Sequence, residues 1–109
     1  MTSVVAEVED EISTRKIGHE TILLVKGATS PHQLSGALLN LIREGVGPIV
    51  ARAIGAGAVN QAAKGCAIAC TLGAQEGFDV TYRLRFEGVT IKGEPRSAMA
   101  FEVVAAPKG

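Results

Sequence analysis

The sequence predicts an α/β chain, more closely a two-layer α+β domain with two helices packed on a mixed four-stranded sheet. Two apolar segments rich in β-branched residues, 21–26 and 49–54, have the composition of buried strands, and each precedes a helical pattern. From residue 78 the pattern changes to alternating apolar and polar residues, which is typical of antiparallel strands. The expected order of elements is therefore β-α-β-α-β-β.

The chain length and charge suit one domain with an acidic extension. The 109 residues suffice for a single core, and 47% hydrophobic with 20% charged residues is typical of a globular chain. Residues 1–20 contain five acids and two bases, a net charge of −3, so the remaining residues carry +3. We expect a flexible acidic N-terminal arm at 1–20 with at most one short strand or helical turn, a folded domain at 21–105, and a loose tail at 106–109.

The first strand and helix have clear boundaries in the sequence. Gly27 ends the apolar segment 21–26, and Ser30 then provides a helix N-cap with Pro31 in the first helical position. Gln33 completes a capping box, and Gly45 supplies the left-handed stop. The buried stripe of this helix is expected to be Leu34, Leu38, Leu41 and Ile42.

The second strand and helix follow by a parallel crossover. In segment 49–54, Val50, Arg52 and Ile54 are expected on one face and Ile49, Ala51 and Ala53 on the other. The second helix is expected from about Ala58 to Leu72, ending at Gly73. Its buried stripe is predicted to consist mostly of small residues: Val59, Ala62, Ala63, Cys66, Ala67 and Cys70.

The last two strands are expected to form a hairpin. Segment 78–87 alternates, 89–92 continues extended, 93–95 turns, and 96–104 returns as the last strand. Because the aromatic residues fall on the apolar face, we expect none of them to stack on a nucleic-acid base. The residues predicted to point inward are Phe78, Val80, Tyr82, Leu84 and Phe86.

The most distinctive segment of the chain is 49–65, which reads as a strand, a glycine turn and a helix start. The first N–H groups of a helix, with its dipole, favour an anion such as phosphate, and nearby polar side chains could complete such a site. The alternative is that the glycines only allow a tight turn and close packing. Candidate nucleic-acid or anion-binding residues are Gly55, Gly57, Asn60, Gln61 and Lys64, with Arg52, Lys92 and Arg96 as further basic candidates.

Nothing in the sequence indicates catalysis or a bound metal. Cys66 and Cys70 have no companion histidine pair, and His32 has no partner at a readable spacing. The turn at Gly55 and Gly57 lacks the third glycine and closing acid of a dinucleotide site. We therefore expect no enzymatic activity, no metal and no cofactor. The chain has no secretory or membrane-spanning segment, so we expect a cytoplasmic protein.

The block 53–64, Ala-Ile-Gly-Ala-Gly-Ala-Val-Asn-Gln-Ala-Ala-Lys, carries a family resemblance. Together with Lys26-Gly27-Ala28, Leu34–Leu38 and Ile91–Glu94, it resembles stage V sporulation protein S, a small bacterial family with an Alba-like fold. The resemblance covers about residues 22–104. It implies a dimeric, non-enzymatic factor in development, sporulation and septum formation, with nucleic-acid binding suggested by similarity to Alba chromatin proteins.

Two functions remain open from the sequence. The basic body and the glycine turn favour a regulator that binds RNA or DNA weakly and in a salt-sensitive way. A zero net charge favours a protein-interaction or self-assembling module. So does the absence of Alba's basic residues, which are replaced by Ala28, Thr29, Gly55, Gly57 and Gln61. Both predict a homodimer; an anion or nucleotide sensor is a third possibility.

Overall fold

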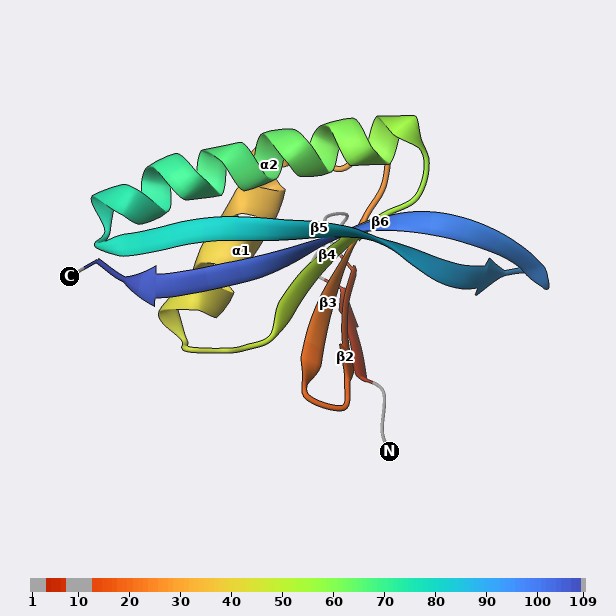
Figure 1. Ribbon diagram of the computed structural model, residues 1–109, viewed down its shortest axis with the longest axis horizontal. Helices are drawn as coiled ribbons and strands as arrows, with labels where there is room; N and C mark the ends of the chain where they lie inside the picture. Colours follow the sequence, from red (N-terminus) through yellow and green to blue (C-terminus); the bar gives the residue numbers. More distant parts are fainter. Residues whose placement is uncertain (1–3, 8–12, 109) are drawn as a thin grey trace.

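The computed structural model, which describes residues 4–7 and 13–108, contains two helices and a six-stranded sheet (Figure 1). Both helices lie on the same face of the sheet, because one apolar cluster joins their buried residues to β3–β6. The elements in chain order are β1 (Val4–Glu7), β2 (Ser13–Ile17), β3 (Glu20–Val25), α1 (Pro31–Arg43), β4 (Ile49–Ala53), α2 (Ala56–Gln75), β5 (Phe78–Ile91) and β6 (Glu94–Pro107).

The sheet has the strand order β1-β2-β3-β4-β6-β5, in which only β3 and β4 are parallel. Its β3–β6 part confirms the predicted β-α-β-α-β-β order and mixed four-stranded sheet. The first 20 residues add two strands where at most one was expected. A turn at Gly18, with a φ of 60°, lets β2 fold back on β3 so that Ile17 opposes Glu20. The other parts of the expected arm, 1–3 and 8–12, lie outside the described residues.

Helix α1 forms as its capping residues predict. The Ser30 Oγ accepts a hydrogen bond from the Gln33 N–H at 3.3 Å, and Pro31 occupies the first turn. Gly45 has a φ of 73°, which is the left-handed conformation of a helix stop. Leu34, Leu38 and Ile42 are buried as predicted, whereas Leu41 is only half-buried and Leu39, which was not predicted, is buried in its place.

Helix α2 is longer than expected and buries a different stripe. It runs through Gly73, which the sequence suggested as its end, to Gln75. A Cβ on Gly65 would lie 2.6 Å from Leu34 Cδ2, and one on Gly73 would lie 2.9 Å from Val80 Cγ2. These glycines therefore allow close packing rather than stopping the helix. The predicted Ala63 and Ala67 are exposed; the buried residues are Ala58, Ala62, Gly65, Cys66, Ala69 and Gly73.

The two faces of the sheet differ in what covers them. Ile49, Ala51 and Ala53 of β4 belong to the cluster under the helices, as the alternation predicted. Val50 belongs to a smaller buried cluster on the opposite face, with Ile22 and Ala100. The helix-bearing face is therefore the main core, and the other face carries a small apolar patch with ion pairs around it.

Strands β5 and β6 form a hairpin that is longer than the sequence suggested. Both central residues of its turn, Lys92 and Gly93, have positive φ values of 51° and 80°, which fits a two-residue type I′ loop rather than a turn at 93–95. Pro107 pairs with Phe78, so β6 extends to residue 107 instead of 104. Residues 106 and 107, expected in the loose tail, are thus part of the sheet.

The distal part of this hairpin, residues 84–99, is called the outer hairpin below. Leu84 and Phe86 were predicted to point inward, but they are 55% and 77% exposed. They lie on the same face as Val80 and Tyr82, which pack against the main core. The tip of the hairpin extends past the start of α2 (Figure 1), and no other part of the described chain buries these two side chains. The prediction of their burial was wrong, because alternation shows on which face of the sheet a side chain lies but not whether another element packs over that face.

Candidate functional site

The N-terminus of α2 has unsatisfied backbone donors. Gly55 is its N-cap, with φ 94° and ψ 154°, and no side chain caps the helix. The first helical backbone bond runs from the Val59 N–H to the Gly55 carbonyl at 3.0 Å. Ala56 and Gly57 are exposed, and no acidic residue lies in the first turn. This end of α2 therefore has the polarity that favours an anion.

A turn between β3 and α1 packs beside this helix start. A Cβ on Gly57 would lie 3.7 Å from the Gly27 Cα, so the two backbones approach closely. Gln61 donates from Nε2 to the Thr29 carbonyl at 2.8 Å, and the Thr29 Oγ1 accepts from the Lys26 N–H at 2.8 Å. Gln61, a predicted binding residue, is thus engaged in holding the turn against α2. The same contacts fix Lys26 beside the helix start.

Asn60 and Lys64 lie on successive turns of the same side of α2. Both are exposed. Lys64 makes no ion pair with any residue that the structure describes. Four of the predicted residues are therefore brought together at one exposed part of α2: Gly55, Gly57, Asn60 and Lys64.

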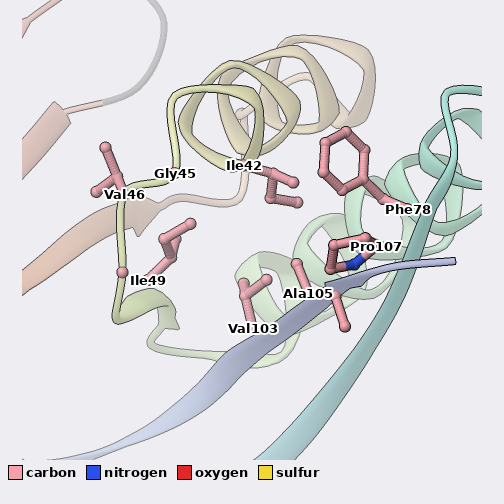
Figure 2. A pocket seen from close by; sticks show the side chains of 10 residues that line it. Ile42, Gly45, Val46, Ile49, Phe78, Val103, Ala105 and Pro107 are labelled. Carbon is pink, nitrogen blue, oxygen red and sulfur yellow. The ribbon is translucent and has the colours of Figure 1, made fainter. Parts of the chain in front are cut away.

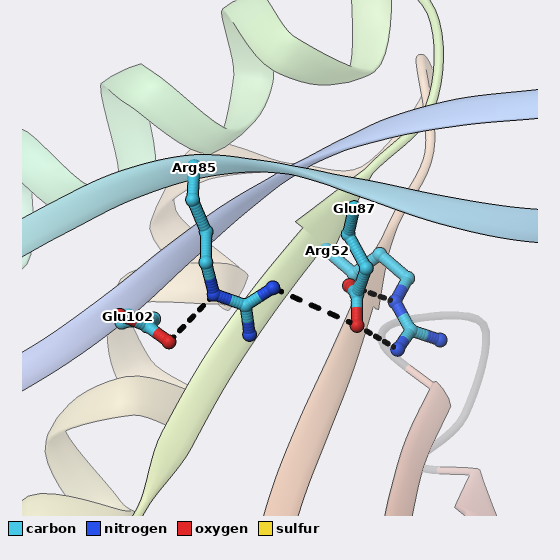
Figure 3. Close-up of polar contacts among 4 residues, drawn as sticks. All are labelled: Arg52, Arg85, Glu87 and Glu102. Atoms are coloured by element: carbon cyan, nitrogen blue, oxygen red, sulfur yellow. Dashed lines mark hydrogen bonds and ion pairs between the residues drawn. The ribbon is translucent and has the colours of Figure 1, made fainter.

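Arg52 lies elsewhere, on the face of the sheet without helices. Its Nε and Nη2 both donate to the Glu87 carboxylate at 2.9 Å (Figure 3). Arg85 donates to Glu102 at 2.7 Å and lies 3.9 Å from Glu87, so one network joins β4, β5 and β6. The hydrogen bonds from Arg52 lower the pKa of Glu87. Because its charge is matched by Glu87, we leave Arg52 out of the site.

Lys92 and Arg96 lie near the end of the outer hairpin. Both are exposed, Lys92 in the turn and Arg96 opposite Val89. Figure 1 shows that the outer hairpin extends beyond the start of α2. These two residues therefore form a separate basic group rather than part of a single pocket with Lys64.

Charges outside the ion pairs are unevenly distributed over the molecule. One end contains the carboxyl end of β3, the start of α2 and the outer hairpin; its ionic residues outside the ion pairs are Lys26, Lys64, Lys92, Arg96 and Glu94. At the opposite end lie Glu20, Glu44, Asp79 and Lys108, and Arg83 lies between the two ends, in the middle of β5. We call the first group the basic end.

Sequence reasoning missed three residues of interest. Lys26 follows Val25, the last residue of β3, which runs parallel to β4, so it lies at the same sheet edge as the start of α2. That topology was a usable signal. Leu84 and Phe86 were assigned to the core, and only the tertiary structure shows that they are exposed.

An apolar pocket of about 400 Å³ lies at the other end of the sheet (Figure 2). It opens between the C-terminal end of α1 and the paired ends of β5 and β6. None of its lining residues is ionisable, so it holds no group for acid–base chemistry. The side chains that Figure 2 labels around it include Ile42, Val46, Ile49, Phe78, Val103, Ala105 and Pro107.

The two cysteines are engaged in packing. Burial raises the pKa of the Cys66 thiol to about 12, which suppresses its thiolate. The Cys70 thiol donates to the Val80 carbonyl at 3.2 Å, and the Tyr82 hydroxyl donates to the Cys66 carbonyl at 3.0 Å. Within the described ranges, 4–7 and 13–108, there is no group of three His, Cys, Asp or Glu side chains placed to hold a metal.

The fold and the basic end define a small α+β protein with an uncapped helix N-terminus and a projecting hairpin. The family model of stage V sporulation protein S matches residues 21–106. The chain belongs to this family, as the block at 53–64 suggested, and the family name associates it with sporulation. Neither α1 nor α2 combines the length and apolar character needed to cross a membrane.

Proposed function

We propose that this chain is a non-enzymatic, homodimeric regulator in bacterial development or sporulation that binds RNA or DNA weakly through its basic end. The observation that carries the proposal is the distribution of cations. Arg43, Arg52 and Arg85 are each bound to a glutamate, and Arg83 is a single exposed cation in the middle of β5. The basic end instead presents four cations and one acid, none of them in an ion pair with the described residues: Lys26, Lys64, Lys92, Arg96 and Glu94.

A phosphate backbone suits this arrangement of groups. The amides at the start of α2 can donate to one phosphate, and Lys26 and Lys64 lie on either side of them along α2 and the adjoining turn. Lys92 and Arg96 would contact a phosphate further along the strand. None of these groups reads a base edge, so the expected binding is independent of sequence.

The number of contacts sets the expected salt dependence. About four phosphate contacts give a slope of roughly −3 in log K against log salt, so affinity should fall by about 50–150-fold between 50 and 200 mM salt. We propose measuring this by fluorescence anisotropy with labelled single- and double-stranded 20-mers of RNA and DNA. An absence of binding to every probe at about 50 mM salt would remove nucleic acid from the proposal.

Charge reversal at matched positions locates the interface. Lys64→Glu should weaken binding by about tenfold and reduce the salt slope by about one, because it removes one phosphate contact. Lys108→Glu is the control, since it makes the same charge change at an exposed position of the opposite end. Equal losses in both variants would mean that only net charge matters and that the basic end is not the interface.

A protein-interaction or self-assembling module without nucleic-acid binding is the second candidate. The exposed Leu84 and Phe86 favour it, since apolar side chains on a projecting hairpin are typical of partner contacts. In that case Lys64→Glu and Arg96→Glu would leave capture of the partner unchanged. Co-purification from the native host, with and without nuclease, separates the two functions.

A further inference from the structure

Strand β5 has an unpaired edge. It is the last strand in the order β1-β2-β3-β4-β6-β5, and no strand among the described residues pairs with its outer side. An edge strand presents a row of N–H and C=O groups that another strand can bind. At 14 residues, β5 is one of the two longest strands of the sheet, so this edge is a large potential interaction surface.

The register of the hairpin shows which backbone groups face outward. Ile91 and Glu94 flank the two-residue loop, and such a flanking pair exchanges both backbone hydrogen bonds. Hydrogen-bonded pairs then alternate along the ladder, which continues without a bulge to Phe78 and Pro107. The odd-numbered residues of β5 therefore bond to β6, and the N–H and C=O groups of Leu84, Phe86 and Gly88 point to the free edge.

The side chains along this edge are apolar on one face and charged on the other. Leu84 and Phe86 are exposed on the helix-bearing face. Arg85 and Glu87 alternate with them along β5 and lie on the opposite face, in the network of Figure 3. Arg85 and Glu87 are already paired within the chain, with Glu102 and Arg52, so a partner strand needs apolar residues on one face and no like charge directly opposite either of them on the other.

We propose that a second copy of this chain pairs with the β5 edge, antiparallel, about a two-fold axis at Phe86. Phe86 then lies opposite the partner's Phe86, and Leu84 lies opposite the partner's Gly88, where no side chain obstructs it. Arg85 lies opposite the partner's Glu87, and the same pair recurs across the axis. The outward groups of residues 84, 86 and 88 form about six backbone hydrogen bonds between the copies.

The charges select this register over its neighbours. A two-fold axis at Arg85 would place arginine opposite arginine, and one at Glu87 would place glutamate opposite glutamate. An axis at Leu84 would place Arg83 opposite the partner's Arg85. Like charges at directly opposed positions destabilise a sheet, whereas opposite charges stabilise it. Among axes at residues 84–87, only the axis at Phe86 places no like charges directly opposite each other.

The closeness of the charged pairs follows from the same ladder. Residues 85 and 87 bond to β6, so across the new interface they form non-hydrogen-bonded pairs, in which opposed Cα atoms are only about 4.5 Å apart. The assembly rests on the proposed homodimer and specifies its surface. It makes one sheet that is continuous through both copies.

Disulfide trapping tests the register directly. In the proposed dimer the two copies of residue 86 have Cα atoms about 5.5 Å apart, within the range that a disulfide spans. The two copies of residue 84 are offset by four residues along the strands, which puts their Cα atoms about 14 Å apart. Under mild oxidation, Phe86→Cys should form covalent dimers at least about tenfold faster than Leu84→Cys or the unchanged chain. Both positions are exposed on the same face, so accessibility is matched.

Light scattering on the unchanged chain separates failure of the surface from failure of the homodimer. If the chain is dimeric but Phe86→Cys cross-links no faster than Leu84→Cys, the homodimer is supported and the proposed pairing at the β5 edge is wrong. A monomeric chain at every concentration would overturn both. Rapid cross-linking of Phe86→Cys in a chain that binds no RNA or DNA would support the surface and remove only the nucleic-acid part of the proposed function.

A second variant protects the test against an effect of the cysteine itself. Phe86→Asp should weaken the dimer by about 100-fold or more, because it places two like charges opposite each other in place of two apolar rings. Leu72→Asp, on α2 and 39% exposed, should leave the dimer intact. If Phe86→Asp stays dimeric and instead loses affinity for single-stranded RNA, Phe86 stacks on bases and the proposed pairing is wrong.

Discussion

The inner and outer halves of the β5–β6 hairpin have the same alternating pattern but different surroundings. In the inner half, Val80 is buried and Tyr82 packs against the main core. In the outer half, Leu84 and Phe86 occupy the same face and are exposed. Strand periodicity thus assigns a residue to a face of the sheet, and the packing of other elements decides whether that face is core or interaction surface.

The sharpest test of this difference truncates one aromatic residue in each half. Tyr82→Ala should lower the free energy of unfolding by about 2–4 kcal/mol, since it leaves a cavity under α2 and removes the hydrogen bond to the Cys66 carbonyl. Phe86→Ala should change it by less than about 1 kcal/mol when measured on the dissociated chain. Urea denaturation at low protein concentration checks both. Equal losses would show that the outer half is also packed within one chain.

Paired glycine substitutions test the same contrast in the opposite direction, by adding volume. Gly73→Ala places a methyl group 2.9 Å from Val80 Cγ2, and we expect a loss of about 1–2 kcal/mol even after the gain in helix propensity. Gly88→Ala meets open space within one chain and should be neutral or slightly stabilising when measured on the dissociated chain. Thermal unfolding of the two variants provides the comparison, and a neutral Gly73→Ala would contradict the close contact between α2 and β5.

The ion network at the junction of the halves predicts an acid-sensitive contribution. Arg52 lowers the pKa of Glu87 below its ordinary 4.5, so the stabilisation is complete above that value and is lost as the pH falls through the lowered pKa. Glu87→Gln should cost about 1 kcal/mol at pH 7 and progressively less as the pH falls through the lowered pKa of Glu87. Denaturation curves at several pH values check this, with Glu44→Gln as an exposed control. A loss that does not depend on pH would exclude the ion pair as its cause.

The smallest expected effect concerns thiol reactivity beneath the inner half. With its pKa raised to about 12, Cys66 should exist as thiolate in only about one part in 10⁴ at pH 8 and react very slowly with iodoacetamide. Its raised pKa stabilises the fold below the pKa of an unfolded thiol, and this contribution is lost as the pH rises toward 12. Mass spectrometry of Cys66→Ala and Cys70→Ala chains separates the two sites. Fast labelling of Cys66 would show that α2 opens away from the hairpin.

Local signals predicted most of the fold. Ser30, Pro31 and Gly45 define the ends of α1 by side-chain and backbone chemistry that acts within a few residues, and the structure confirms them. The predicted end of α2 at Gly73 was wrong, because a glycine in the sequence can indicate either a helix stop or a close packing contact. Only the distance from Gly73 to Val80 distinguishes the two. The extent of β6 to Pro107 depends on pairing with Phe78, a residue 29 positions away, which no local pattern reveals.

The candidate site was only partly predictable for the same reason. The start of α2 follows from the glycine turn, so Gly55, Gly57 and Asn60 were found together. Arg52 and Lys64 are both basic residues near that turn, yet one is bound by Glu87 and the other is exposed. Their difference depends on a partner 35 positions from Arg52 in the sequence, and therefore on tertiary structure.

Among the residues that the structure describes, the two margins of the sheet are unequal in length, with four residues in β1 and 14 in β5. A sheet with two long margins could add copies without limit and grow into a fibre, whereas a four-residue margin offers few bonds for a further copy. If the β5 edges of two copies pair with each other, the described sheet has only the short β1 edge of each copy left unpaired. Growth would then stop at two chains, so this protein would have a built-in limit on its own polymerisation.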